Sequence, residues 1–379
     1  MIEFNKKLIF RKLFLDITYF FIITLATLSL IVWVIQAVNF LDFVTDDGHG
    51  LGVYLKYTLL SFPKILSKLM PFIFFVSIFY ILNKFEDNNE LKIFWIFGTN
   101  KREFLNVILK YSLIILLIQL TLTLLIVPYT QNKARTYIQK SSIDFFPSLI
   151  NEKKFIDTVE KLTIYVEKKK ENSYEKIYLK DNKDSSSVRI IYAETGNLVN
   201  DNDERFLNLN NGKIININQD KITSFDFKNT TFDLSKYLTK SIIDFKIQER
   251  NTMSILNCFI NFFLLNDKSY YHIKNCNEGS AGMFREEIYK RFFKPFFFLS
   301  LGMIISFIII FSKENSNYKT NRFFIFLGGI FTIIISEFLM SLSNSSLINL
   351  QISILFTFLL FIFLFLFLFN KFKSNKINI

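Results

Sequence analysis

Charge-free apolar stretches of membrane-spanning length recur along this chain, and they constrain its fold more than any other feature. Ile17–Leu41, Tyr111–Asn132 and Pro295–Ser312 contain no Asp, Glu, Lys or Arg. A helix needs about 20 predominantly apolar residues to cross the hydrocarbon core of a bilayer. Phe323–Asn370 is almost free of charge and long enough for two further helices, and the polar stretch Ser341–Gln351 predicts the turn between them.

A sixth span is predicted around Leu69–Asn83, although its charge-free part is short. These 15 residues cannot cross the bilayer as a helix, so the span must extend back through Lys68 and Lys64. The composition, 51% hydrophobic with 48 Phe, is that of a membrane protein. The first span is not expected to be a cleaved signal peptide, because it is long and no small-residue cleavage site follows it.

The basic residues of the connections predict how the spans cross the membrane. Lys and Arg are enriched in cytoplasmic loops, and this bias sets the orientation of a multi-pass protein. Fifteen such residues lie on the side of the two termini, whereas the short connections of the opposite side hold Lys56 alone. We therefore predict that both termini and the loop around Glu90 are cytoplasmic. The fifteen are Lys6, Lys7, Arg11, Lys12, Lys84, Lys92, Lys101, Arg102, Lys110, Lys313, Lys319, Arg322, Lys371, Lys373 and Lys376.

The long segment between the third and fourth spans has a different character. Apolar and polar residues alternate over Leu162–Glu167, which is the period of a strand with one buried face. Asn211-Gly212 predicts a hairpin turn, because both residues tolerate positive φ, and Gly196 predicts a second turn. Short strands without intervening helices indicate an antiparallel sandwich or jelly roll. A membrane barrel is not expected, because the strands are too short and lack a lipid-facing side. Further strand-like stretches are Ile177–Leu179, Val188–Tyr192, Phe206–Leu209, Ile214–Ile217 and Phe225–Phe227.

The predicted fold is an α-helical integral membrane protein with six transmembrane helices and an all-β periplasmic jelly-roll domain inserted between helices 3 and 4. Residues 1–132 hold spans one to three, with a cytoplasmic helix near 88–100. Residues 133–284 form the periplasmic region, with the jelly roll at about 150–250. Residues 285–379 hold spans four to six.

The sequence holds no arrangement typical of an active site. It has no Gly-x-x-x-x-Gly-Lys-[Ser/Thr] loop, and so lacks a P-loop of its own. His49 and His272 lie far apart, without the spacing of metal ligands. The net charge of +12 comes without a readable nucleic-acid motif. Cys258 and Cys276 form either a disulfide, as an oxidising compartment allows, or two unrelated free thiols.

Several short motifs, in a fixed order, carry a resemblance to a known family. They are "WVIQAVNFLDF" at the end of span one, Pro63 and Pro71 in span two, Glu90 followed by Gly98, "AETG" and "LNLNNG" in the β-domain, and Glu287, Arg291 and Pro295 before span four. With the six spans around a β-domain, they resemble the lipopolysaccharide export permeases of the LptF/LptG (YjgP/YjgQ) family over nearly the whole chain, closer to LptF than to LptG. The chain departs from the family pattern at Asn39, in the last external loop, which lacks Pro and Trp, and in Met253–Gly282.

The resemblance implies a permease subunit of an ABC-type lipopolysaccharide exporter in the bacterial inner membrane. Such a subunit extracts lipopolysaccharide and passes it to a periplasmic bridge of β-jelly rolls. The implied partners are a paralogous six-span permease (LptG-like), a dimer of cytoplasmic ATPase subunits (LptB-like) and a single-span periplasmic adaptor (LptC-like). The chain is then a transporter subunit and not an enzyme. It needs no cofactor of its own, because the partner subunit uses the ATP.

The loop between spans two and three is expected to contact the ATPase. Leu91, Phe94, Trp95 and Gly98 fall at positions i, i+3, i+4 and i+7 and form one helical stripe. A short helix that is apolar nearly all round needs two surfaces, here the ends of the membrane helices and a groove in the ATPase. Glu90 stands at the helix N-terminus, where the dipole favours an acidic residue. The alternative is an interfacial helix that lies on lipid.

Basic residues at the external ends of the spans are candidates for binding lipid phosphates. Lys64 and Lys68 lie four residues apart and share one helix face. Lys56, Lys133 and Arg135 are looser candidates for the same rim. The alternative for the paired lysines is snorkelling, in which each ammonium group reaches water or any anionic lipid.

Two further sets of residues are candidates for contact with the lipid or a partner. The apolar interior of the β-domain is expected to hold acyl chains in transit, unless its side chains only pack the core. Glu337 lies inside span five, where an ionisable residue is expected to face the bundle interior or a neighbouring subunit, unless it reaches the outer interface. The candidate acyl-lining residues are Ile164, Val166, Leu179, Leu207 and Phe227.

Two other functions compete with this reading. The chain could be the LptG-like subunit of the same exporter, or a membrane-anchored periplasmic sensor or scaffold. A sensor normally carries a cytoplasmic output domain, and the longest cytoplasmic segment, around Glu90, is too short for one.

Overall fold

The computed structural model divides the chain into two compact units. One unit consists of Met1–Gln36, Leu60–Asn132 and Lys246–Ile379, and the other of Ala37–Leu59 and Lys133–Phe245. We call them the membrane unit and the sheet unit. The structure describes residues 2–41, 51–149, 152–159, 162–170, 173–184, 187–201, 204–218, 221–233, 246–260, 276, 278–311, 313 and 316–374.

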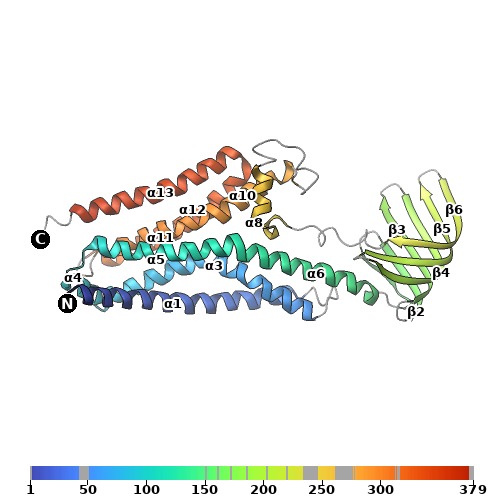
Figure 1. Cartoon of the computed structure of the whole chain (residues 1–379), viewed down its shortest axis with the longest axis horizontal. Helices are drawn as coiled ribbons and strands as arrows, with labels where there is room; N and C mark the ends of the chain where they lie inside the picture. Colours follow the sequence, from blue (N-terminus) through green and yellow to red (C-terminus); the bar gives the residue numbers. More distant parts are fainter. Residues whose placement is uncertain are drawn as a thin grey trace. The chain divides into compact units, whose positions relative to one another are not determined.

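Six helices are long and apolar enough to cross a membrane, as predicted (Figure 1). Spans one and two are α1 (Ile2–Asn39) and α3 (Leu51–Asp87), and α3 extends back through Lys68 and Lys64. Spans five and six are α12 (Tyr318–Ser345) and α13 (Leu347–Ser374), which meet inside the predicted turn. The start of α1 and the end of α13 lie at the same end of the helices (Figure 1). We call this the termini-side end and the opposite one, where the chain leaves for the sheet and returns, the sheet-side end.

Spans three and four are composite helices. Span three runs from α5 (Lys101–Thr121) through the π-helical η1 (Leu122–Ile126) into α6 (Val127–Leu149). Span four contains α10 (Ala281–Ile288), the π-helical η6 (Tyr289–Phe293), η7 (Lys294–Phe296), α11 (Phe297–Ser306) and η8 (Phe307–Ile310). Short π-helical segments inside α-helices are rare and occur mostly at functional sites. Here the two are linked, because the Thr123 hydroxyl donates to the Arg291 carbonyl over 3.1 Å.

The interior of the membrane unit is packed with aromatic rings from several helices. Phe74 and Phe75 of α3 are fully buried, and Phe74 meets Phe298 edge to face with ring centroids 5.0 Å apart. A Cβ atom at Gly329 of α12 would lie 2.0 Å from the Phe75 ring, so the glycine permits α12 to approach α3 closely. This packing fixes the helices that carry the site described below.

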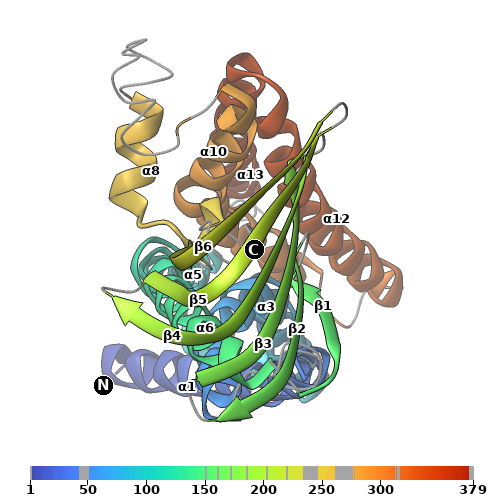
Figure 2. The same ribbon diagram turned by 90° about the vertical axis from the view of Figure 1, so that its right-hand side faces the viewer.

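The segment between spans three and four contains the predicted all-β domain. Its six strands form one antiparallel sheet in sequence order, and the sheet is strongly curved (Figure 2). Six transmembrane helices with an all-β domain between helices 3 and 4 are thus confirmed. The strands are β1 (Phe155–Val159), β2 (Leu162–Lys170), β3 (Ser173–Asp184), β4 (Ser187–Asp201), β5 (Glu204–Asn218) and β6 (Lys221–Asp233).

The two predicted turns are wrong, because both lie inside long strands. Gly196 is within β4, and Asn211 and Gly212 are within β5. A Cβ atom at Gly212 would lie 1.9 Å from the Tyr192 carbonyl oxygen, and one at Gly196 would lie 2.4 Å from Ile177 Cδ1. These glycines therefore permit close approach between neighbouring strands. Glycine inside a strand often has this role.

Asn211 and the glycines lie on a crease that crosses the sheet. Lys176 in β3 and Asn211 in β5 both have positive φ, 50° and 51°. At the crease the alternation of inward-facing residues skips one position, which is how a strand bends without ending. The inward-facing residues around it are Ile191, Ala193, Gly196 and Leu198 on β4, and Leu207, Leu209, Gly212 and Ile214 on β5.

The core of the sheet unit draws side chains from both sides of the crease. Leu179 and Ile191 come from one side and Leu198 and Leu207 from the other, and all four join one buried cluster. The sheet therefore curls over its own apolar face in the manner of a roll.

Candidate functional site

Proline in α3 creates the local structure that holds the two predicted lysines. Pro71 has no N–H to donate to the Ser67 carbonyl one turn earlier. The buried side chain of Gln119 supplies the missing donor, with its Nε2 3.0 Å from both the carbonyl oxygen and the hydroxyl of Ser67. Span three thus fixes α3 at the turn between Lys64, which is half-buried, and Lys68, which is exposed.

Lys64 and Lys68 lie within electrostatic range of further lysines from the start of span four. The charges that act on Lys64 include those of Lys68, Lys290 and Lys246, opposed by the carboxylate of Glu249. Lys68 and Lys290 also act on Lys294. We call Lys64, Lys68, Lys290 and Lys294 the lysine cluster. The sequence analysis missed its two members from span four, although both stand within the Glu287 to Pro295 motif.

The carboxylates near the lysine cluster already have partners. Glu287 accepts from Lys290 Nζ at 2.9 Å and from Arg291 Nε at 3.0 Å. Lys294 Nζ lies 2.6 Å from the carboxylate of Glu337. Among the described residues, Lys64 and Lys68 form no ion pair. Several ammonium groups in a partly desolvated place repel one another, so the cluster suits a multivalent anion.

Arg291 lies in the same part of the membrane unit as the lysine cluster, but its charge is used to hold the chain together. Its side chain is 2% exposed. Besides Glu287, it donates to the carbonyls of Gln248 and Arg250 and to the Thr252 hydroxyl at 2.8–3.1 Å. These bonds anchor the segment that returns from the sheet unit to the start of span four.

Glu337 does not lie in the interior of this chain's bundle. Its side chain is 55% exposed, and its partner is Lys294. That it faces a neighbouring subunit stays a prediction.

The looser basic candidates belong to the sheet unit. Lys56 Nζ lies 5.2 Å from the centre of the Tyr137 ring, and Lys133 and Arg135 are on α6. The single rim predicted from sequence is therefore divided between the two units.

The loop between spans two and three contains the predicted short helix, α4 (Glu90–Ile96). Leu91 and Phe94 are each 1% exposed, and the Phe94 ring packs between Phe10 and Phe104 at 5.3 Å from each. The predicted stripe thus faces the chain's own helices. The other face carries Ile93 and Ile96, which are 43% and 80% exposed.

Gly98 sets the turn that ends α4. A Cβ atom there would have nothing within 4 Å, but its φ of +69° is one that only glycine adopts readily. Its N–H donates to the Trp95 carbonyl over 2.9 Å, which ends α4 and turns the chain into span three.

Glu90 connects α4 to span one. Its carboxylate lies 3.0 Å from Lys12 Nζ and accepts from Asn88 at 3.2 Å. Partial burial alone would raise the pKa of this carboxyl. The hydrogen bonds from Lys12 and Asn88 and the charges of Lys12 and Lys84 outweigh that effect and hold its pKa below the ordinary 4.5.

The five candidate acyl-lining residues all meet in the core of the sheet unit. Ile164, Val166, Leu179 and Leu207 are no more than 2% exposed, and Phe227 packs against them. A pocket of about 640 Å³ in the same unit is lined by other residues, among them Tyr165, Tyr178, Tyr192, Lys176 and Glu194. The structure therefore groups the five residues but leaves their contact with lipid a prediction.

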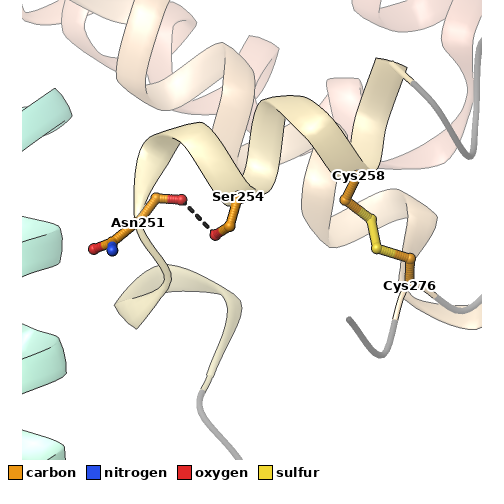
Figure 3. Close-up of a disulfide and its surroundings, with 4 residues drawn as sticks. All are labelled: Asn251, Ser254, Cys258 and Cys276. Carbon is orange, nitrogen blue, oxygen red and sulfur yellow. Dashed lines mark hydrogen bonds between the residues drawn. A yellow bond between two sulfur atoms is a disulfide. The ribbon is translucent and has the colours of Figure 1, made fainter. Parts of the chain in front are cut away.

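Cys258 and Cys276 form a disulfide, which decides between the two alternatives left by the sequence (Figure 3). Both are fully buried, beside Ile255 and Phe284. The bond holds α8 (Thr252–Cys258) to the segment that precedes span four, within the stretch that departs from the family pattern. His49, His272 and Lys376 lie outside the described residues.

The comparison with known families decides what kind of protein carries this site. Residues 11–371 match the model of the lipopolysaccharide export system permease LptF/LptG. The chain belongs to this family. LptF/LptG permeases are transporter components and not enzymes, and the six membrane helices are those of a multi-pass inner-membrane protein. The match does not separate LptF from LptG.

A curated relative is similar over part of the chain. It is an uncharacterized protein, RP871, of Rickettsia prowazekii (strain Madrid E), 25% identical over 193 residues. The similarity covers 50% of this chain and 53% of the relative, and so spans about half the length of each.

Proposed function

We propose that this chain is the LptF-like permease subunit of an ABC-type exporter that extracts lipopolysaccharide from the inner membrane. The observation that carries the proposal is the lysine cluster, which has more cations than carboxylates at one end of the membrane helices. A lysine ammonium is an effective point-charge ligand for phosphate. The lipid A part of lipopolysaccharide carries phosphates at the depth of the lipid headgroups.

The sheet-side end is the periplasmic one in this proposal. The bias of Lys and Arg places both termini in the cytoplasm. The disulfide supports the same orientation independently, because such bonds persist in the periplasm and are rare in the cytosol. The lysine cluster then lies at the depth of the outer leaflet, and the sheet unit is periplasmic.

The exposed face of α4 is the contact for the cytoplasmic ATPase. Ile93 and Ile96 protrude from a helix whose other face is fixed by Leu91 and Phe94. An apolar helix face that protrudes from a rigid base suits a groove in a partner. The chain contributes no ATP site of its own. The other partners in this proposal are a paralogous six-span permease and a single-span periplasmic adaptor.

The interior of the sheet unit receives the acyl chains after extraction. The described core side chains are buried against one another, so in this proposal the lipid enters where the roll opens along the edge strand β1 or β6. Photo-crosslinkers at Leu179 and Leu207 should then capture lipopolysaccharide only while ATP is hydrolysed. Crosslinks to protein alone would indicate that these side chains only pack the core.

The experiment that tests the function is reconstitution. The chain, its co-purified permease partner and the ATPase are placed in vesicles that contain lipopolysaccharide, and its transfer to a soluble periplasmic acceptor is measured. ATP-dependent transfer is expected. Stable assembly and ATP hydrolysis without any transfer would contradict the proposal and favour a scaffold.

A further inference from the structure

A second group of charged contacts lies at the termini-side end, between the end of α3 and the start of α12. The Arg322 guanidinium binds both carboxylate oxygens of Asp87, with NH2 to Oδ1 at 2.9 Å and NH1 to Oδ2 at 3.2 Å. It also lies 3.7 Å above the centre of the Tyr318 ring. A bidentate pair of this kind fixes orientation as well as distance.

The same group closes the last turn of α3. The final carbonyls of a helix have no partner within it. Here Lys313 Nζ donates to the Asp87 carbonyl at 3.0 Å. Arg322 makes a further contact one turn earlier, where it donates to the Asn83 carbonyl at 3.3 Å. The backbone N–H of Lys313 donates to the buried Glu86 carboxylate at 2.7 Å. The start of α12 and its preceding connection therefore serve as the cap of α3.

This cap is adjacent to α4. Asp87 ends α3, and α4 begins at Glu90 after a tight turn in which Asn89 has a φ of 62°. The Asn88 and Asn89 N–H groups donate to carbonyls of the last turn of α3 at 3.0 Å. A force on α4 therefore reaches Asp87 through two hydrogen-bonded residues.

At its other end, α12 reaches the lysine cluster. Glu337 lies fifteen residues after Arg322 on the same helix, about 22 Å away, and binds Lys294. Between these points α12 packs on α3, where Phe326 meets Phe79 at 5.2 Å and Gly329 lies against Phe75. One continuous helix thus joins the two charged groups.

We propose that the Asp87–Arg322 pair is a positioning pair that transmits movement of α4 to span five, and through Glu337 to Lys294 in the lysine cluster. The inference rests on the proposed function, because it assigns α4 to the ATPase and the cluster to the lipid. When the ATPase displaces α4, α12 moves with the end of α3. The Glu337–Lys294 contact then changes, and with it the number of lysines available to the phosphate.

A purely structural role makes a different prediction. If the pair only sets the register of α12 against α3, its loss lowers stability but leaves the amount of lipid released per ATP hydrolysed unchanged. If it transmits movement, its loss separates hydrolysis from release, and ATP is hydrolysed without lipid release. The informative quantity is therefore the amount of lipopolysaccharide released per ATP hydrolysed.

The test uses the complete complex in vesicles. Arg322→Gln and Asp87→Asn are each expected to lower the lipid released per ATP by at least about fivefold, the lower limit of ordinary coupling between sites. The double variant Asp87→Arg, Arg322→Asp restores the opposite charges and should recover most of the release. Arg322→Lys keeps the charge without the planar fork and should fall between. Lys319→Gln is the control, since Lys319 is exposed on the same helix and forms no ion pair with a described residue.

The outcomes separate this inference from the function on which it rests. If the wild-type complex releases no lipid, the proposed function is wrong and the coupling role falls with it. If the wild type releases lipid and Arg322→Gln does so with the same yield per ATP, only the positioning role is overturned. If Arg322→Gln fails to assemble, the charge-exchange variant decides. An assembled exchange variant that releases as much lipid per ATP as the wild type supports the proposal. An exchange variant that hydrolyses ATP but releases at least fivefold less lipid per ATP overturns it.

Discussion

The two ends of the membrane unit differ in what their charged groups contact. At the termini-side end the carboxylates of Asp87, Glu90 and Glu103 each meet a cation, from Arg322, Lys12 and Lys6, at 2.9–3.4 Å. At the sheet-side end Glu287 and Glu337 also have cationic partners, but Lys64 and Lys68 form no ion pair with any described residue. Among the described residues, both ends also have cations without a carboxylate partner, so the position of the pairs makes the difference. The pairs at the termini-side end join α3 to α12 and α1 to α4, whereas Lys64 and Lys68 lie within electrostatic range of further lysines, which suits a multivalent anion.

The largest expected effect is the loss of stability when Arg291, a buried structural cation at the sheet-side end, is replaced. Arg291→Met leaves the buried Glu287 and two carbonyls without their main donor. Removing one partner of a buried ion pair typically costs about 3–5 kcal/mol. We expect a large drop in the thermal unfolding temperature in detergent, or loss of monodisperse protein.

Lys290→Met is the matched control for Arg291→Met. Lys290 binds the same buried Glu287, but its own side chain is 29% exposed. Glu287 also keeps Arg291 as a partner when Lys290 is replaced. This variant should stay folded and lose lipid retention instead. Equal destabilisation by the two substitutions would remove the distinction between Arg291 as a structural cation and Lys290 as a lipid-binding member of the lysine cluster.

A smaller effect is expected at the termini-side end. Ile96→Asp places a charge on the most exposed apolar side chain of α4 and should weaken ATPase association about tenfold, which corresponds to about 1.4 kcal/mol. Ile222→Asp in β6 is the control, because Ile222 is 73% exposed and Ile96 is 80% exposed. Wild-type association of Ile96→Asp in a pull-down would indicate that this face of α4 lies on lipid.

The smallest predicted effect concerns pH at the same end. The pKa of Glu90 is lower in the folded chain than its ordinary 4.5. Its contact with Lys12 therefore contributes fully above the ordinary pKa and is lost as the pH falls through the lowered value. Wild type should unfold at a higher temperature than Glu90→Gln at pH 7, and the difference should vanish in acid. A difference that persists below the pKa of Glu90 would show that it does not arise from the carboxylate.

The sequence predicted the membrane helices well because their signal is local. Span two was placed through Lys64 and Lys68 by length alone, and the period of two in Leu162–Glu167 identified a strand. The turns predicted at Gly196 and Gly212 are wrong, because both glycines lie inside strands. Glycine there serves contacts with Ile177 and Tyr192 on neighbouring strands, and a local pattern does not contain them.

The site was predicted only in part for a similar reason. Lys64 and Lys68 share a helix turn and could be paired from their spacing. Lys290 and Lys294 join them only through the packing of span four, more than 200 positions further along the chain. The stripe at Leu91 and Phe94 was identified correctly as apolar, but the sequence could not show that it faces the chain's own helices.

The central claim is that Lys64 and Lys68 bind the phosphates of the lipid and do not merely snorkel. Retention of lipopolysaccharide by the purified complex is measured with intact lipid A and with lipid A from which the phosphates have been removed. The wild type and a Lys168→Glu, Lys170→Glu control, with two exposed lysines of β2 changed, should retain the phosphorylated lipid preferentially. The assembled Lys64→Glu, Lys68→Glu variant should lose that preference, with single Ala substitutions milder. An undiminished preference for phosphate in the double variant would contradict the account.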